Sequence, residues 1–239
     1  MNIALFGYGK MGKVIERIAV ERGHTITAKI DRDNPKESAD LSNTDVVIEF
    51  SVPDSAQDNI RFCIDHQLPI VIGTTGWYQH LGALTDYCNS NNGALLHATN
   101  FSVGVNIFFE INKRLAQLMS SQDQYRASVI EIHHTEKLDA PSGTGITLCE
   151  GIIDNHTKYD KWENVKLSEI SDKGALSIES VRLQNVPGTH EIKYASLVDE
   201  IEIKHTAHNR DGFGLGSVIA AEWIKGKKGV FTMKDVLNF

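Results

Sequence analysis

Apolar and polar positions in the first hundred residues predict strands and helices in turn. The apolar runs with the length of buried strands are 3–6, 24–30, 45–50, 68–72 and 94–97. Apolar residues recur at helical spacing in the segments 14–19, 53–66 and 79–91. Strands that alternate with helices predict an α/β fold with a parallel, doubly wound sheet of the Rossmann type.

The pattern changes after Gly104. Apolar residues from Val105 to Leu118 recur at helical spacing, and the run Ala127–Ile130 predicts a strand. A further helix is expected over about 143–156, followed by a polar surface loop at 155–161. Apolar and polar residues then alternate, as in half-buried antiparallel strands, over 175–181, 190–194 and 200–206. This half therefore predicts an α+β domain with a mixed sheet.

Two domains follow from these patterns. We expect a dinucleotide-binding domain at 1–104 and a substrate-binding and oligomerisation domain at 105–212. The last segment, 213–239, contains a predicted helix and a short extended run, and we expect it to return to the first domain.

Composition narrows the classes of partner. The 239 residues carry a formal net charge of −7, which argues against a nucleic-acid binder because phosphates require an excess of basic residues. Cys63, Cys88 and Cys149 lie far apart without CxxC spacing, so neither a disulfide framework nor a zinc knuckle is expected. No run approaches the ~20 apolar residues of a membrane span, and the N-terminus lacks the basic region of a signal peptide. We expect a cytoplasmic protein without a nucleic-acid or membrane partner.

A glycine-rich turn follows the first predicted strand and precedes a helix. The sequence Gly7-Tyr8-Gly9-Lys10-Met11-Gly12 fits GxGxxG, and this setting makes the motif a strong indication of a dinucleotide site. Its glycines permit a tight turn, close approach of a pyrophosphate and close packing of helix on strand. The N–H groups at the helix start favour an anion.

The second predicted strand ends at Asp31, nineteen positions after Gly12. This is close to the sequence spacing of ~20 residues at which a carboxylate binds a ribose hydroxyl in dinucleotide-binding folds. The alternative is that Asp31 only caps the turn that follows. Arg32 can pair with a 2′-phosphate, so both NADH and NADPH are expected as cofactors.

Two later strand ends are candidates for the nicotinamide side of the cofactor, because ligands of open α/β sheets bind at the carboxyl ends of strands. These residues are Gly73, Thr74 and Thr75 after one strand, and Ala98, Thr99, Asn100 and Phe101 after the next. For Gly73, ordinary turn chemistry is the alternative.

The stretch from Glu131 to Gly145 combines His133, His134 and Lys137 with a helix-opening Pro-Ser-Gly-Thr-Gly. Histidine and a partly desolvated lysine can both transfer protons near neutral pH. Adjacent residues on a strand point to opposite faces, so one histidine is expected at the substrate and the other in support. The backbone N–H groups near Gly143, with the Thr144 hydroxyl, predict a seat for a carboxylate or phosphate.

This stretch has two alternative interpretations. A zinc site is disfavoured because the paired histidines lack a cysteine or an ExxH partner at ligand spacing, so no metal is expected. A solvated polar loop would have no need to combine two histidines, a lysine and a helix-opening seat. The stretch is therefore predicted to be the substrate site.

Together these motifs give the chain a resemblance to the 4-hydroxy-tetrahydrodipicolinate (dihydrodipicolinate) reductases. The resemblance extends from Gly7 to Phe213 and includes the long motif E-x-HH-x-x-K-x-D-A-P-S-G-T and the later G-x-H-E. It implies NAD(P)H-dependent reduction of a cyclic dicarboxylate in lysine and diaminopimelate biosynthesis, by a cytoplasmic enzyme that forms a homotetramer.

The resemblance also implies a role for each candidate residue. His133 is implied as proton donor or acceptor, Lys137 as proton donor, His134 as a substrate contact, and Gly143 and Thr144 as the carboxylate seat. Gly7 to Met11 are implied at the pyrophosphate, Asp31 and Arg32 at the adenosine ribose, and Gly73 to Thr75 with Ala98 to Phe101 at the nicotinamide half.

Some features leave other functions open. The family often has Arg-Gly-Gly where this chain has Arg182-Leu183-Gln184. Another NAD(P)-dependent enzyme, such as an aspartate dehydrogenase, would share the first domain but needs no Pro-Ser-Gly-Thr-Gly seat. A non-catalytic dinucleotide sensor would keep the glycine-rich turn but has no use for Lys137.

Overall fold

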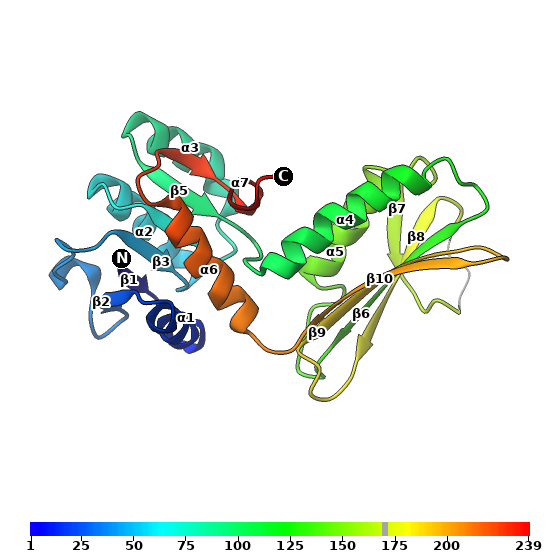
Figure 1. Ribbon diagram of the computed structural model, residues 1–239, viewed down its shortest axis with the longest axis horizontal. Coiled ribbons are helices and arrows are strands. Elements are labelled where there is room, and N and C mark those ends of the chain that lie inside the picture. The colour runs from blue at the N-terminus through cyan, green and yellow to red at the C-terminus, as the bar shows by residue number, and fades with distance from the viewer. Residues whose placement is uncertain (169–171) are drawn as a thin grey trace. The chain divides into compact units, whose positions relative to one another are not determined.

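The computed structural model describes residues 1–168 and 172–239 (Figure 1). By their contacts these residues form two compact units. Unit 1 consists of residues 1–103 and 210–239, and unit 2 of residues 104–209.

Unit 1 is built on a parallel sheet of six strands in the order β11-β5-β4-β3-β1-β2. The strands are β1 (Asn2–Phe6), β2 (Thr25–Ile30), β3 (Val46–Glu49), β4 (Ile70–Ile72), β5 (Ala94–His97) and β11 (Gly229–Phe231). All residues of β3 and β4 are buried, as expected of central parallel strands that are covered on both faces.

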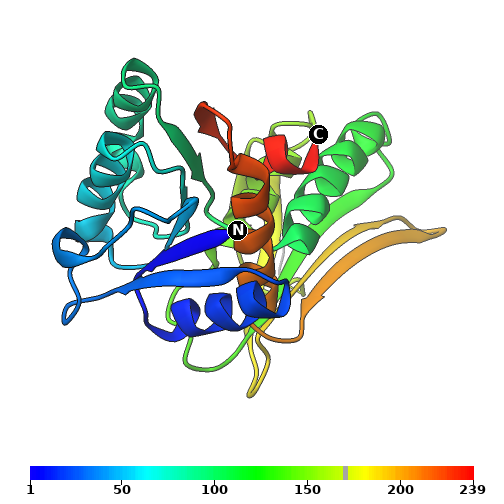
Figure 2. The ribbon, with the colours of Figure 1, turned by 60° about the vertical axis from the view of Figure 1, so that its left-hand side comes forward.

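Helices cover both faces of this sheet (Figures 1 and 2). Apolar residues of α1 (Lys10–Glu21) and α6 (Asp211–Ile224) belong to the core on one face, with α7 (Met233–Leu237). Those of α2 (Pro53–Asp65) and α3 (Leu81–Ser90) form the core on the other. Short 3-10 turns are present at Lys36–Ser38 and Tyr78–His80. The predicted Rossmann-type doubly wound sheet is confirmed.

The C-terminal segment completes unit 1. β11 pairs in parallel with β5, with Gly229 opposite Ala94. The preceding α6 lies against α1, where a Cβ atom on Gly214 would come within 2.9 Å of Ile18. The missing side chain at Gly214 thus allows the two helices to pack closely.

Unit 2 contains a five-stranded mixed sheet in the order β10-β9-β6-β8-β7. Its strands are β6 (Arg126–His133), β7 (Lys161–Asn164), β8 (Ala175–Arg182), β9 (Gly188–Ala195) and β10 (Glu200–Ala207). β9 pairs antiparallel with β6 and β10, whereas β8 pairs in parallel with β6 and β7. α4 (Val103–Met119) and α5 (Gly143–Ile153) share one apolar core with this sheet. The predicted mixed sheet is confirmed.

Two details of unit 2 differ from the prediction. β7 begins at Lys161, where a surface loop was expected, because the polar run Lys161–Asn164 pairs with β8 despite carrying little apolar signal. β6 continues beyond Ile130 to His133, so Glu131 and His133 belong to the strand rather than to the loop after it. None of the helices in the described residues is long and apolar enough to cross a membrane.

The pairing of β6 with its neighbours determines which side chains meet. Glu131 lies opposite His190 of β9, and His133 lies opposite Arg182 of β8. Glu131 and His133 are two residues apart and therefore share one face of the sheet. Four chemically active side chains are thus gathered at the carboxyl end of β6.

Candidate active site

The glycine-rich turn of unit 1 has the geometry that its sequence predicts. Gly7 has a φ of +94°, and a Cβ atom there would lie 2.2 Å from the Phe50 carbonyl oxygen. A Cβ on Gly12 would lie 2.4 Å from the Gly7 carbonyl oxygen, so the helix could not approach the turn. Gly9, by contrast, faces open space. The turn thus requires glycine at Gly7 and Gly12 for packing and leaves room for a ligand at Gly9.

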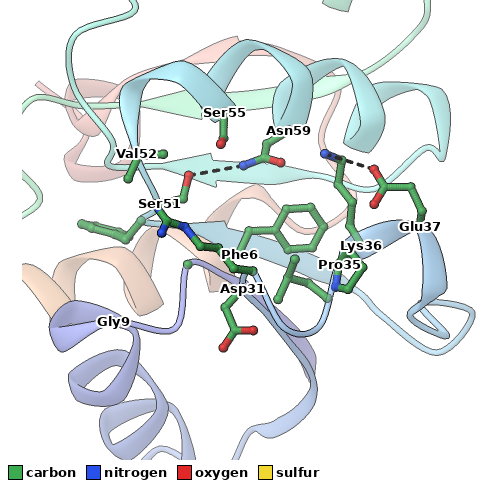
Figure 3. A pocket seen from close by; sticks show the side chains of 14 residues that line it. Phe6, Gly9, Asp31, Pro35, Lys36, Glu37, Ser51, Val52, Ser55 and Asn59 are labelled. Carbon is green, nitrogen blue, oxygen red and sulfur yellow. Dashed lines mark hydrogen bonds and ion pairs between the residues drawn. The ribbon is translucent and has the colours of Figure 1, made fainter.

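A pocket of about 400 Å³ opens beside this turn (Figure 3). Gly7, Gly9, Asp31 and Arg32 are the predicted cofactor residues among its lining. Asp31 also accepts hydrogen bonds from the backbone N–H groups of Asp33 and Asn34, both at 3.0 Å, so it caps a turn as well as facing the pocket. An open backbone at Gly9, the start of α1 and a carboxylate at the end of β2 together suit an adenine dinucleotide.

The other residues of the turn lie at the start of α1. Lys10 and Met11 begin the helix. The Tyr8 hydroxyl donates a hydrogen bond to Glu16, and the Tyr8 ring lies beneath the Lys29 ammonium, 4.7 Å from the ring centre. The Tyr8 side chain is therefore engaged with α1 and β2, which leaves the backbone of Tyr8 for a ligand.

The candidates for the nicotinamide half lie at the ends of β4 and β5, further along the same edge of the sheet. Gly73 packs against the Phe50 ring, where a Cβ atom would come within 2.2 Å. Thr74 is buried, and its hydroxyl accepts a hydrogen bond from Ser51 N at 2.8 Å. Phe101 is only 1% exposed, so its side chain belongs to the core, whereas Thr75 and Thr99 are exposed. Ala98 and Asn100 are half-buried.

Three uncharged polar residues in this pocket were not predicted from the sequence. Ser51, Ser55 and Asn59 line it, and Asn59 donates a hydrogen bond to the Ser51 hydroxyl at 3.3 Å (Figure 3). Behind them the fully buried Glu49 accepts hydrogen bonds from both Ser51 and Asn59. Burial raises the pKa of Glu49 despite these hydrogen bonds. The position of Ser51 at a strand end was the available signal, but no spacing pointed to Asn59.

In unit 2 the predicted substrate site lies around the end of β6. His133 is the last residue of the strand and is buried, and its Nδ1 lies 3.8 Å from a Glu131 carboxylate oxygen. The His190 ring lies edge-on to the His133 ring, with ring centres 5.1 Å apart. His134 follows the strand and is half-buried. The two adjacent histidines thus differ in setting, because only His133 shares a face with Glu131.

Burial and hydrogen bonding together set the protonation of this cluster. Burial lowers the pKa of His133, an effect that the charge of Glu131 opposes and that of Lys137 reinforces. It lowers the pKa of His190 to about 4. Burial raises the pKa of Glu131, but hydrogen bonds from Ser142 and Ser180, together with the charge of His133, outweigh it, and the pKa lies below its usual range. At neutral pH the cluster therefore holds neutral imidazoles beside an ionised carboxylate.

Lys137 lies on the loop between β6 and α5. Its ammonium forms an ion pair with Asp139, with Nζ to oxygen distances of 2.8 and 2.9 Å. The Lys137 side chain is 23% exposed and that of Asp139 59%, so the pair can be reached by a ligand. The hydrogen bond from Lys137 lowers the pKa of Asp139. The loop thus carries a cation whose present partner is a solvent-exposed carboxylate.

The predicted anion seat is the start of α5. Ser142 is the N-cap, and its hydroxyl accepts a hydrogen bond from Gly145 N at 3.0 Å. The first N–H groups of a helix have no acceptor within the helix, which leaves those of Gly143 and Thr144 for a ligand. A Cβ on Gly143 would meet nothing within 4 Å, so the backbone there is open to approach.

Among the described residues, Glu131, His133 and His190 are the group with metal-ligand chemistry. The Glu131 carboxylate is already taken by Ser142 and by the Arg182 guanidinium, whose Nη2 lies 3.3 Å away. A neighbouring positive charge disfavours a divalent cation at this carboxylate.

Sequence reasoning left Glu131, Ser142, Arg182 and His190 without roles. Glu131 was part of the long motif and His190 of G-x-H-E, but spacing alone does not bring them together. The signal that unites them is the strand register, which places His190 opposite Glu131 and Arg182 opposite His133. The two pairs are 59 and 49 positions apart in the sequence, so the register depends on long-range pairing.

Comparisons with known proteins agree with this geometry. A family model described as dihydrodipicolinate reductase, N-terminus, matches residues 1–101, and one described as dihydrodipicolinate reductase, C-terminus, matches residues 104–237. The chain belongs to the dihydrodipicolinate reductase family. A 4-hydroxy-tetrahydrodipicolinate reductase of Christiangramia forsetii is 47% identical over 238 residues, which are 100% of this chain and 98% of that protein. The corresponding enzyme of Alkaliphilus oremlandii is 31% identical over 242 residues, 100% of this chain and 99% of that protein.

A solved structure of the family has the same fold. The dipicolinate-bound dihydrodipicolinate reductase from Paenisporosarcina sp. TG-14 superposes with a TM-score of 0.80 at 20% identity, with 97% of each chain covered. The function predicted from the sequence is therefore confirmed: NAD(P)H-dependent reduction of 4-hydroxy-tetrahydrodipicolinate in lysine and diaminopimelate biosynthesis. The alternatives of an aspartate dehydrogenase and of a non-catalytic sensor are set aside.

Proposed function

We propose that Lys137 supplies the proton of the reduction and that the start of α5 holds a substrate carboxylate. Replacing the hydroxyl of 4-hydroxy-tetrahydrodipicolinate by hydrogen consumes one hydride and one proton and releases one water. The proton must come from a group close to the substrate. The Lys137 ammonium suits this role because it is a cation on the loop that leads directly into the anion seat.

The ion pair with Asp139 supports this assignment. Asp139 pairs with the Lys137 ammonium and is itself exposed, so a substrate carboxylate can replace it as the partner of Nζ. Lysine then serves twice, because it offsets one of the two negative charges of the substrate and donates the proton.

His133 and His134 take different parts in the proposal. His133 is buried beside an ionised carboxylate and has a lowered pKa, so at neutral pH it is a neutral imidazole that exchanges a proton with the reaction rather than holding a permanent charge. His134, which follows the strand, is proposed as a substrate contact through its ring. Gly143 and Thr144 complete the seat with backbone N–H groups and the Thr144 hydroxyl.

The cofactor residues are proposed in unit 1. Gly7, Tyr8, Gly9, Lys10 and Met11 would hold the pyrophosphate, with Gly12 packing the cofactor-binding helix start against the turn, and Asp31 and Arg32 would hold the adenosine ribose. The residues proposed for the nicotinamide half are Gly73, Thr74, Thr75, Ala98, Thr99, Asn100 and Phe101. When bound, NADH or NADPH supplies the hydride. Arg32 would pair with the 2′-phosphate of NADPH, while Asp31 would accept from the 2′-hydroxyl of NADH.

The enzyme is further proposed to be cytoplasmic and to form a homotetramer. The three cysteines are free, buried thiols, which suits a reducing compartment. β10 is an edge strand of the unit 2 sheet, and the turn before it exposes Leu197 and Val198 almost completely. Unpaired strand edges with exposed apolar residues are sites of association between chains.

The single observation that carries the catalytic proposal is the Lys137–Asp139 ion pair next to the open start of α5. The test is the oxidation of NADH by the purified protein, given the condensation product of pyruvate and aspartate semialdehyde, with the same mixture lacking that product as control. We expect turnover that pyridine-2,6-dicarboxylate inhibits competitively. Absence of both turnover and inhibition would refute the proposal.

A further inference from the structure

A buried carboxylate lies beneath the substrate site without a role in the proposed chemistry. Glu131 is 0% exposed, yet it is ionised at neutral pH. A buried charge costs free energy unless it is paired and hydrogen-bonded. Its partners therefore indicate what the residue is for.

One set of partners is at the start of α5. Ser142 N donates to both Glu131 oxygens, at 3.0 and 2.9 Å, and the Ser142 hydroxyl donates to the same carboxylate. A Cβ on Gly145 would lie 2.8 Å from a Glu131 oxygen, so glycine is needed for the helix to come this close. Glu131 thus fixes the helix start that forms the anion seat.

The other partner is Arg182, the last residue of β8. Its Nη2 lies 3.3 Å from a Glu131 oxygen and donates to the Asp139 carbonyl at 2.6 Å, while its Nε donates to the Lys137 carbonyl at 3.3 Å. The planar guanidinium presents several donors in fixed directions, so it can grip two loop carbonyls and one carboxylate at once. Arg182 therefore ties the backbone of the Lys137 loop to the buried carboxylate.

We infer that Glu131 and Arg182 are a positioning pair that holds the Lys137 loop and the start of α5 in register, an inference that rests on the roles proposed for Lys137 and Gly143–Thr144. Neither residue is assigned a contact with substrate. The Glu131 carboxylate binds the start of α5 directly, and it holds the Lys137 loop through the Arg182 guanidinium. Proton transfer depends on such register, because a small misplacement of the acid lowers the rate strongly.

The test separates positioning from simple structural support. A single variant leaves one buried charge uncompensated, whereas Glu131→Gln combined with Arg182→Met removes both charges and retains the side-chain volumes. We expect the double variant to unfold near the wild-type temperature but to have a kcat at least ~10-fold lower, with the KM for NADH within about twofold. A double variant with wild-type kcat as well as wild-type thermal stability would overturn the inference.

A second variant keeps the test decisive if the double variant does not fold. Arg182→Lys retains the charge but has no fork to bind both loop carbonyls, so we expect a kcat at least ~10-fold lower with NADH binding unchanged. Wild-type kcat in this variant would also overturn the inference. Asp172→Asn, which breaks an exposed ion pair with Lys161 in the same unit, is the matched control and is expected to retain wild-type kcat. Inactivity of the wild type itself would refute the proposed function instead.

Discussion

In unit 1 the turn between β1 and α1 is shaped by residues that lack side chains, whereas in unit 2 the loop between β6 and α5 is shaped by side chains buried beneath it. Gly7 and Gly12 are required because a Cβ atom would collide with backbone. The Lys137 loop is instead held by Arg182, Ser142 and Glu131. Both loops end at a helix start that suits an anion.

The two loops are therefore expected to respond differently to mutation. The glycine-rich turn depends on local backbone conformation, so changes there act on packing or on cofactor binding. The loop of unit 2 depends on a charged network, so changes there act on the placement of reacting groups. Variants of the glycine-rich turn and of the Lys137 loop test this difference.

The largest expected effect is on the catalytic step in unit 2. Lys137→Ala removes the proposed acid and should lower kcat by ~100-fold or more, because loss of general-acid catalysis costs about that much. The Kd for NADH, measured by fluorescence titration, should stay within about twofold. Lys161→Ala, an exposed lysine of the same unit, is the control. Loss of NADH binding in the Lys137 variant would assign this lysine to the cofactor instead.

A matched pair of glycine variants tests unit 1. Gly7→Ala meets the Phe50 carbonyl in a left-handed conformation and should destabilise the protein by ~2 kcal/mol or more. Gly9→Ala meets no atom within 4 Å, so stability should be retained while the KM for NADH rises ~10-fold, since the methyl group blocks approach of the pyrophosphate. Thermal denaturation and steady-state kinetics distinguish the two. Equal stability of both variants would contradict the assignment of separate roles.

A smaller effect is expected on cofactor choice. Arg32 lines the pocket beside Asp31. Arg32→Ala should weaken NADPH binding by ~10-fold and NADH binding by less than about twofold, because only NADPH carries a 2′-phosphate. Ratios of kcat/KM for the two cofactors measure this. Arg61→Ala, which removes a cation stacked on Tyr87, serves as control. An equal loss of kcat/KM for both cofactors would show that Arg32 does not bind the 2′-phosphate.

A separate effect concerns pH and stability. The pKa of His190 is lowered from an unfolded value near 6.5 to about 4, so between these values the unfolded chain binds more protons than the folded one. Stability should therefore rise with pH from about 4 to 6.5, with His190 contributing up to ~1.4 kcal/mol per pH unit. His190→Asn should flatten this slope in unfolding experiments at several pH values. An unchanged slope would assign the dependence to other groups.

The two regions also differ in how far the sequence could predict them. The glycine-rich turn and the alternation of strands and helices in unit 1 follow from local rules, because a left-handed φ at Gly7 and a buried strand such as β3 leave direct marks on residue type. The mixed sheet of unit 2 was predicted from alternation, but β7 was missed because its pairing with β8 leaves no such mark.

The candidate site of unit 2 was predicted in part. His133, Lys137 and the seat at Gly143 and Thr144 stand close together in the sequence, so spacing and residue type pointed to them. Glu131, Arg182 and His190 meet only through the register of β6, β8 and β9, which depends on distant pairing.

Unit 1 is proposed to bind the cofactor and unit 2 the substrate. The inhibition constant of pyridine-2,6-dicarboxylate tests this division between the units. It should be measured, together with the KM for NADH, in Thr144→Val and Gly9→Ala. We predict a crossed result: Thr144→Val raises the inhibition constant ~10-fold with the KM for NADH unchanged, and Gly9→Ala does the reverse. A Thr144 variant that alters only the KM for NADH, or a Gly9 variant that alters only inhibition, would contradict the account.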